Sequence, residues 1–245
     1  MQSFFYFSIP FLLFEPVQCK LFTLLFRKLT DITYPPHIFA MVEKLFISYN
    51  NVHKLCQEAA VEIKKFSPDL MIAIGGGGFI PARILRTFLK EPGAKNIPIQ
   101  AIGLSLYEDM GTNNQVETAG LEVVRTQWLD FGTLAQNCGS LIGKTVLIVD
   151  EVDDTRTTLH YALSELEKDV QKQAVALGRE NETTRFLIFV LHNKNKEKKA
   201  ELPAEMIAEG RYVAARTVDD IWIAYPWEAV DIEQHTANAI AQGNN

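Results

Sequence analysis

Cysteine is scarce in this chain. Three cysteines occur in 245 residues, and Cys19, Cys56 and Cys138 are far apart. Their spacing supplies neither a disulfide framework nor the closely spaced ligands of a metal site, and it indicates a reducing, cytoplasmic setting. Cys56 falls on the apolar face of a predicted helix, where the pattern favours a small buried hydrophobic residue.

Positive charge is also in short supply. The chain has 24 Lys and Arg against 30 Asp and Glu, so its formal net charge is −6. An acidic chain is not attracted to a phosphate backbone, and a nucleic-acid partner is therefore not expected. The densest basic run, residues 194–199, is interrupted by Asn195 and Glu197, and we expect a solvated loop there rather than a binding patch.

Uninterrupted apolar runs are missing as well. Residues 1–40 contain eight of the fifteen phenylalanines, but Pro10 and Pro16 interrupt any helix before the roughly 20 apolar residues that a bilayer requires. The start, Met1-Gln2-Ser3, lacks the basic residues that begin a signal peptide. A membrane partner is therefore not expected for the chain as a whole.

The composition of residues 1–40 leaves three explanations open. They are a poor targeting sequence, an added membrane-contacting arm, or translation of sequence upstream of the true start. Met41 begins a segment that looks like an ordinary cytosolic N-terminus. We therefore favour the third explanation, with an atypical extension over residues 1–40 and one functional domain over residues 41–245.

Strands and helices alternate along the rest of the chain. Apolar spacing predicts helices from Asn50 to Ile63, Phe79 to Leu89 and Thr157 to Leu177, and strands over Leu70–Ile74, Ile97–Leu106, Val146–Val149, Phe186–Leu191 and Tyr212–Ala215. Residues 107–122 are polar and are expected to form a mobile loop. This order predicts an α/β fold with a doubly wound, mostly parallel sheet.

The run from Val146 to Thr158 carries most of the functional information. Its strand ends in Asp150 and Glu151, and Asp154 and a threonine-rich turn follow before the next helix. The free N–H groups and positive dipole end of a helix start suit a phosphate, whereas carboxylates accept hydrogen bonds from sugar hydroxyls. An ordinary charged turn with a Thr N-cap would leave three crowded, mutually repelling carboxylates unexplained.

Four consecutive glycines, Gly75 to Gly78, follow the strand at Leu70–Ile74. Glycine allows a backbone to approach an anion closely and to adopt positive φ. A glycine run alone is weak evidence, because tight turns also use glycine. Carboxyl ends of parallel strands share one edge of a sheet, so this run is expected beside the acidic motif in one crevice.

The acidic pair followed by Asp-Thr-x-x-Thr resembles the signature of the purine phosphoribosyltransferases. Within that family, residues 96–107 and 124–130 look most like the fungal xanthine enzymes, with the fungal hypoxanthine-guanine enzymes next. The resemblance covers nearly all of residues 45–245. It implies a type I phosphoribosyltransferase-like sheet with a small hood subdomain, formed mainly by residues 192–245.

The resemblance also implies roles for individual residues. Asp154 would be the catalytic base, Asp150 and Glu151 would bind the ribose, and the 5′-phosphate would be held by Asp154, Thr155, Arg156, Thr157 and Thr158. Gly75, Gly76 and Gly77 would form a pyrophosphate loop, with a non-proline cis peptide placed at Gly75-Gly76. Ser105 and Tyr107 would begin a flexible loop that closes over the reacting centre.

The C-terminal region would recognise the base. Lys194, Trp222 and Ile223 match the purine-binding positions, and Glu228 stands where the family has an acidic group near the metal or base. Core packing is an equally good explanation for Trp222 taken alone, and Trp227 is expected to be structural. The resemblance further implies Mg²⁺ held mainly by substrate oxygens, phosphoribosyl diphosphate as co-substrate and a homodimer.

These observations favour a purine salvage enzyme. It would transfer a 5-phosphoribosyl group to N9 of a 6-oxopurine, with xanthine favoured and guanine and hypoxanthine as further acceptors. Three alternatives stay open: a mainly hypoxanthine-guanine enzyme, a non-catalytic purine-sensing regulator of the same fold, and a phospho-acceptor signalling domain. The last would not need a threonine-rich loop directly after its acidic residues.

Overall fold

The computed structural model describes residues 43–108, 121–132, 134 and 139–245. The expectations for residues 1–40, for Cys19 and Cys138, and for the centre of the 107–122 loop lie outside this part of the chain. Cys56 is fully buried, and burial raises the pKa of its thiol to about 12, so the prediction of a buried apolar role is confirmed.

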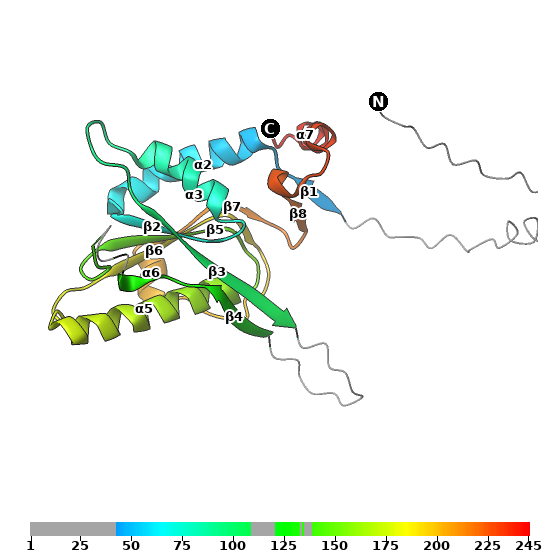
Figure 1. The fold of residues 1–245 in the computed structure, drawn as a ribbon. Helices are drawn as coiled ribbons and strands as arrows, with labels where there is room; N and C mark the ends of the chain where they lie inside the picture. Colours follow the sequence, from blue (N-terminus) through cyan, green and yellow to red (C-terminus); the bar gives the residue numbers. More distant parts are fainter. Residues whose placement is uncertain (1–42, 109–120, 133, 135–138) are drawn as a thin grey trace, which may run out of the picture. The chain divides into compact units, whose positions relative to one another are not determined.

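A six-stranded sheet forms the centre of the described domain (Figure 1). Its order is β4 (Leu121–Gln127), β3 (Ile99–Glu108), β2 (Leu70–Gly75), β5 (Thr145–Asp153), β6 (Arg185–Lys194) and β7 (Tyr212–Val218). All neighbouring strands are parallel except β3 and β4, which are antiparallel. The predicted mostly parallel sheet is confirmed.

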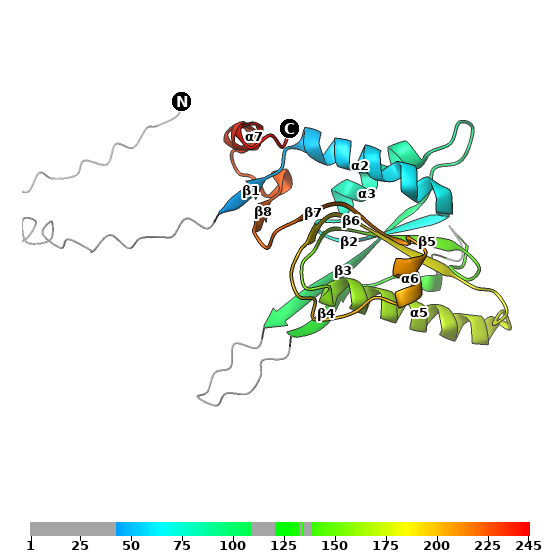
Figure 2. The same ribbon diagram turned by 180° about the vertical axis from the view of Figure 1, so that it is seen from behind.

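Helices cover both faces of the sheet (Figures 1 and 2). One face carries α2 (Tyr49–Ile63) and α3 (Phe79–Leu89), and the other carries α5 (Thr157–Leu177) and the short α6 (Ala204–Ala208). Alternate residues of β2 serve the two layers: Ile72 packs in the cluster with α5, whereas Met71 packs in the cluster with α2 and α3. Burial on both faces explains why the central strands read as continuous apolar runs.

The hood is a separate small layer. β1 (Lys44–Phe46) pairs in parallel with β8 (Trp222–Ala224), and the short 3₁₀ helix η2 (Pro226–Glu228) and α7 (Ile232–Ala241) complete it. The side chain of Gln242 fastens β1, since its Oε1 accepts from Phe46 N and its Nε2 donates to Lys44 O, each at 2.8 Å. The hood is therefore formed by residues that come after Val218 in the chain, together with residues 44–46.

Several strands run further than the sequence predicted. β3 continues to Glu108, β5 to Asp153 and β6 to Lys194. Their polar ends stay in the sheet because they are paired there, for example Asp153 with Asn193. Pairing with neighbours overrides local polarity, which sequence periodicity does not register. Among the described residues, no helix is both long and apolar enough to span a bilayer.

Candidate active site

The carboxyl ends of β2 and β5 meet at one edge of the sheet and form a cleft of about 390 Å³. Most of the residues predicted to bind sugar and phosphate line it: Gly75, Gly76, Gly77, Asp150, Glu151, Asp154, Thr155, Arg156 and Thr158. The expectation that the glycine run and the acidic motif share one crevice is confirmed. The rule that parallel strands present their carboxyl ends together made this prediction possible.

In the glycine loop, residues 75–78, other groups occupy the space that a side chain would take at Gly75, Gly77 and Gly78. A cis peptide bond joins Gly75 to Gly76, as predicted. The carboxylate of Glu151 occupies the place that a Cβ on Gly77 would take. A Cβ on Gly78 would collide with the carbonyl oxygens of Ile74 and Val149, so the loop is packed tightly against both strands.

The acidic pair, Asp150 and Glu151, lies between this loop and the hood. Asp150 is 7% exposed, and its Oδ1 accepts a hydrogen bond of 2.9 Å from the Glu151 N–H. Burial, followed by the neighbouring charge of Glu151, raises the pKa of Asp150 well above its ordinary value. Ionisation of the pair therefore costs free energy. A cation, or a ligand whose hydroxyl groups donate hydrogen bonds to the pair, would reduce this cost.

The phosphate loop, residues 154–158, leads from β5 into α5. Arg156 stands at the N-cap of α5 with φ of 70°, and no side chain caps the helix. The alternative of a Thr N-cap is therefore wrong; Thr155 Oγ1 instead contacts Thr157 Oγ1 at 3.0 Å. An uncapped helix start that faces a cleft presents N–H groups and a positive dipole end to an anion.

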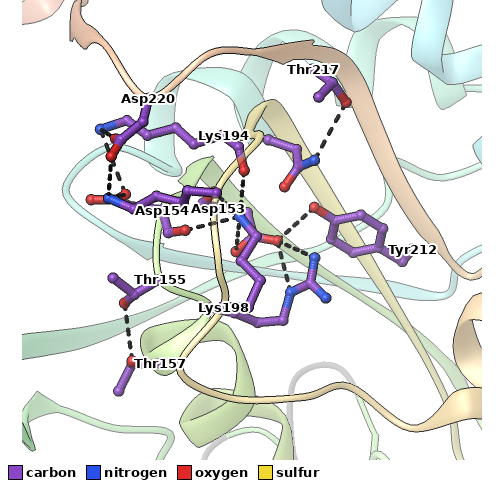
Figure 3. A network of polar contacts seen from close by, with 12 residues as sticks. Asp153, Asp154, Thr155, Thr157, Lys194, Lys198, Tyr212, Thr217 and Asp220 are labelled. Atoms are coloured by element: carbon purple, nitrogen blue, oxygen red, sulfur yellow. Dashed lines mark hydrogen bonds and ion pairs between the residues drawn. The ribbon is translucent and has the colours of Figure 1, made fainter.

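Asp154 belongs to a charge cluster with Lys194, Lys196 and Asp220 (Figure 3). Lys196 Nζ lies 3.0 Å from Asp154 Oδ1 and 2.9 Å from Asp220 Oδ2. Lys194 Nζ lies 3.6 Å from Asp154 Oδ1 and 3.5 Å from Asp220 Oδ1. The structure thus brings the predicted base and the predicted purine-binding lysine together, although Lys194 does not line the cleft.

The expectation of a solvated loop at residues 194–199 is wrong. Lys198 has a side chain only 14% exposed, and its Nζ donates to the carbonyl oxygens of Asp153, Asp154 and Lys194 at 2.8–2.9 Å. The Lys199 N–H donates to Thr155 O at 3.0 Å, and Lys199 lines the cleft. Charge alternation in the sequence did not reveal that these lysines hold the ends of β5 and β6 together.

Asp153 is the site residue that sequence reasoning missed most clearly. It is 1% exposed, and its Oδ2 accepts hydrogen bonds from Arg156 Nε at 3.0 Å, Arg156 Nη2 at 2.8 Å and Tyr212 Oη at 2.6 Å. The Arg156 guanidinium also lies 5.1 Å from the centre of the Tyr212 ring. The Asp-Asp pair at 153–154 was visible in the sequence, but Tyr212 lies too far along the chain to be predicted.

A buried polar chain joins the acidic pair to the hood. Tyr225 Oη donates to Glu151 O at 3.0 Å and lies 2.9 Å from His192 Nδ1, which therefore carries the proton of that bond. The Tyr225 ring stacks on Trp227 at 4.7 Å, and Trp227 packs against the core, so the structural role predicted for Trp227 is confirmed. Burial, then the charge of Arg216, lowers the pKa of His192 to about 4.

The remaining predicted residues lie outside the cleft. Trp222 is 57% exposed, which excludes core packing as its role, whereas the side chain of Ile223 is buried. Glu228 is exposed in η2, and Ser105 is half-buried in β3. The backbone of Tyr107 continues β3, and its side chain is beyond what the structure describes.

The acidic residues of the cleft are also candidates for holding a metal ion. Within the described part of the chain, no three or more His, Cys, Asp or Glu side chains are grouped to hold a metal ion. The carboxylates of Asp150 and Glu151 nevertheless line the cleft, and carboxylate oxygens are the ligands that Mg²⁺ prefers. The donor set therefore suits an ion held chiefly by a substrate and water, with help from this pair.

Comparisons with known proteins agree on one family. Residues 42–200 match the model of the phosphoribosyl transferase domain. The chain is 64% identical over 205 residues to xanthine phosphoribosyltransferase 1 of Saccharomyces cerevisiae, covering 83% of this chain and 98% of that protein. It is 62% identical over 211 residues to the hypoxanthine-guanine phosphoribosyltransferase of the same yeast, covering 83% of this chain and 94% of that protein.

A solved structure shares the fold. The crystal structure of a hypothetical protein from Neisseria gonorrhoeae with bound ppGpp is 35% identical and superimposes with a TM-score of 0.62. The match covers 82% of this chain and 98% of that one. The fold of the described domain therefore recurs in that protein, whose crystal structure contains bound ppGpp.

Proposed function

Since this chain belongs to the phosphoribosyl transferase domain family, we propose that it is a purine salvage enzyme. It transfers the 5-phosphoribosyl group of phosphoribosyl diphosphate to N9 of a 6-oxopurine and releases pyrophosphate. Xanthine is the favoured acceptor, with guanine and hypoxanthine next, because the yeast xanthine enzyme and the yeast hypoxanthine-guanine enzyme are 64% and 62% identical to this chain.

One observation carries the proposal. A single cleft combines an anion-binding glycine loop, two carboxylates and an uncapped helix start beside a threonine-rich loop. A sugar that bears a phosphate at one end and a diphosphate at the other needs these three kinds of partner in one place. A phospho-acceptor signalling domain would need only the carboxylates.

The 5′-phosphate binds the phosphate loop in this proposal. Backbone amides and hydroxyls of residues 155–158 donate to its oxygens, and the dipole of α5 favours its charge. The side chain of Arg156 is engaged by Asp153, so its contribution comes from its backbone. The departing pyrophosphate lies against Gly75, Gly76 and Gly77, whose lack of side chains leaves the amides accessible.

Asp150 and Glu151 hold the ribose hydroxyls and stabilise the developing positive charge at C1′. A carboxylate near an oxocarbenium-like centre lowers the barrier by through-space attraction, most strongly where water is excluded. The crowding that raises the pKa of Asp150 is relieved as that positive charge develops. Asp150 and Glu151 would help to hold a substrate-bound Mg²⁺, which would neutralise the charge of the leaving group.

Asp154 accepts the proton from purine N7 as N9 attacks C1′. Lys194 donates to the 6-oxo group of the base, which draws its ammonium from the charge cluster toward the substrate. Recognition of the base at Lys194 thus removes one cation from beside Asp154 as the N7 proton is transferred.

The hood completes the purine pocket. The exposed Trp222 ring stacks on the flat base, an interaction of about 1–3 kcal/mol, and backbone groups of Ile223 read its substituents. Ser105 and Tyr107 belong to the segment that closes over the reacting centre and excludes water. Glu228, exposed in η2 of the hood, is proposed as an outer ligand of the metal.

We also propose the setting in which the enzyme works. Residues 41–245 form the phosphoribosyltransferase domain, and residues 1–40 are an extension that is not translated in the source organism. By analogy with the family, the protein is a cytoplasmic homodimer whose partners are small molecules rather than nucleic acid or membrane.

The test is an assay of nucleotide formation. The protein, Mg²⁺ and phosphoribosyl diphosphate are incubated separately with xanthine, guanine, hypoxanthine and adenine, and each nucleotide is quantified. We expect turnover of the three 6-oxopurines, fastest with xanthine, and none of adenine. Absence of turnover with every 6-oxopurine would refute the enzyme and leave the purine-sensing regulator.

A further inference from the structure

We propose that Asp153 is a positioning residue that holds the phosphate loop in its binding conformation through Arg156 and Tyr212. Neither the sequence motif nor the comparisons assign it a role. The inference rests on the proposed function, because it concerns the same phosphoribosyl diphosphate. It proposes that Asp153 and its partners determine how tightly the phosphate loop holds that substrate's 5′-phosphate.

The conformation of Arg156 is the first step of the argument. Its φ of 70° lies in the left-handed region, which is unfavourable for any residue with a Cβ. Arg156 is nevertheless the turn between β5 and α5, and α5 begins at the next residue, Thr157. The first amides of α5 reach the cleft only if this turn keeps its shape, so something must stabilise the unfavourable backbone.

Asp153 provides that stabilisation. Two guanidinium nitrogens of Arg156 and the hydroxyl of Tyr212 donate to one oxygen of its carboxylate, which is almost fully buried (Figure 3). Charge-assisted hydrogen bonds of this kind are short and strong, and here they join residues of the turn to β7 on the main sheet. Arg156 is thereby tied from outside its own helix.

Lys198 provides a second positive charge near the carboxylate of Asp153. Its Nζ lies 3.5 Å from Asp153 Oδ1 and donates to the carbonyl oxygen of Asp154 at 2.9 Å. One carboxylate therefore meets two cations, Arg156 and Lys198. Their charges offset that of the buried aspartate, so Asp153 can hold the turn without repelling a phosphate dianion.

The side chain of Asp153 contacts the phosphate side of the cleft rather than the purine side. None of the partners described for it belongs to the hood, where the predicted purine residues Trp222 and Ile223 lie on β8. The third predicted purine residue, Lys194, meets Lys198 only through its backbone carbonyl. Loss of this carboxylate should therefore weaken the binding of phosphoribosyl diphosphate more than the binding of the base. A residue that merely stabilised the domain would not separate the two substrates.

The experiment compares Asp153→Asn with the unaltered full-length chain. The affinity for phosphoribosyl diphosphate with Mg²⁺ is measured by titration calorimetry, and KM for each substrate is measured by nucleotide formation. We expect affinity and KM for phosphoribosyl diphosphate to worsen by about tenfold or more, with KM for the purine within about twofold. Equal changes in both substrates, or no change, would overturn the proposal.

Asp169→Asn is the matched control. Asp169 is a largely buried carboxylate of α5 that accepts from Trp128 Nε1 at 2.8 Å and lies 3.9 Å from Arg125 Nη1. It thus resembles Asp153 in having an arginine and an aromatic donor, but it is outside the cleft. We expect a lower Tm with both KM values unchanged.

A rescue variant tests the mechanism directly. Glycine adopts positive φ without steric cost, so Arg156→Gly should make the turn independent of Asp153. The double variant Asp153→Asn, Arg156→Gly is expected to bind phosphoribosyl diphosphate better than Asp153→Asn alone, and an equal or weaker affinity contradicts the idea. If Asp153→Asn does not fold, Tyr212→Phe takes its place, because it removes one donor to the carboxylate. This variant must still weaken the binding of phosphoribosyl diphosphate more than the binding of the purine.

Direct titration separates this inference from the proposed reaction. If the unaltered chain binds phosphoribosyl diphosphate but forms no nucleotide, the reaction is refuted and the calorimetry still decides the role of Asp153. If the chain forms nucleotide and Asp153→Asn affects both substrates alike, the positioning role alone is refuted. If the unaltered chain does not bind phosphoribosyl diphosphate, both fail.

Discussion

Asp154 is surrounded by charge in the ligand-free protein. Two ammonium groups, of Lys194 and Lys196, lie within 3.6 Å of its carboxylate, and Asp220 shares both of them. In the proposed mechanism, Lys194 turns from this cluster to the 6-oxo group of the purine. Binding of the base would then change the charge that surrounds the proposed base, Asp154.

Replacement of Asp154 tests its role as the base. Asp154→Asn keeps the size and polarity of the side chain but cannot accept the N7 proton, so kcat should fall by about 10²–10⁴ with little change in substrate affinity. Asp220→Asn is the control, since it loses ion pairs with the same two lysines without removing the proposed base. Comparable kcat values for the two variants would remove Asp154 from the mechanism.

The carboxylate of Asp150 is expected to lower the stability of the protein while it supports the binding of substrate. Its raised pKa means that the folded, unliganded protein disfavours the carboxylate, so its stability contribution falls as pH rises through that pKa. Asp150→Asn should therefore raise Tm of the unliganded protein at neutral pH, by about 2–4 °C for each kcal/mol gained in a chain of this size. The same variant should bind phosphoribosyl diphosphate less tightly.

Differential scanning calorimetry near neutral pH checks the Asp150 prediction. Asp219→Asn, at an exposed position three residues before the start of β8, serves as the control and should leave Tm unchanged. A Tm of Asp150→Asn at or below that of the unaltered chain would show that the crowded carboxylate does not destabilise the empty cleft.

At the scale of elements, a buried polar contact joins β6 to the hood. His192 of β6 meets Tyr225, which follows β8 and also holds the carbonyl of Glu151. Its Nδ1–H donates to the tyrosine oxygen, and burial, then the charge of Arg216, favours the neutral imidazole by lowering its pKa to about 4. The hood is therefore sensitive to the charge of a residue that does not touch substrate.

The pKa of His192 predicts how stability depends on pH. Because its folded pKa of about 4 lies below the ordinary 6.5, neutral His192 contributes stability above pH 6.5 that is lost as pH falls toward 4. The loss is on the order of 3 kcal/mol. In denaturant unfolding across this range, His192→Gln should reduce the pH dependence, whereas His160→Gln, at an exposed position, should not.

The elements predicted well are those with a long apolar signal. The helices at Phe79–Leu89 and Thr157–Leu177 have the predicted bounds, and the central strands lie where the apolar runs are. β1 and β8 are three residues long, and β4 is polar and pairs at the sheet edge, so none of them has a clear period. Long-range pairing, not local preference, forms these strands.

For the molecule as a whole, the described contacts bear on the proposed domain limits. The hood depends on β1, which begins at Lys44 and is fastened by Gln242 near the C-terminus. These contacts all lie within residues 41–245, the range proposed for the domain. Removal of residues 1–40 would therefore spare every interaction described for β1.

A chain of residues 41–245 tests the proposed limits. We expect it to have the same Tm and kcat as the full chain, while a chain that also lacks residues 44–46 should lose hood stability and purine affinity. An intact-mass measurement on protein from its source is expected to show Met41 at or near the N-terminus. A mass that begins at Met1 would refute the proposal about the start.

The sequence by itself determined the reaction class. The acidic pair, Asp154 and the phosphate loop are contiguous, and the glycine loop joins them through a general rule about parallel strands. Tertiary structure alone decided the partners of these groups: Tyr212 for Asp153, Asp220 for the lysines and Tyr225 for Glu151. Periodicity and capping act over a few residues, whereas charge pairing depends on distances that only the packing of remote elements sets.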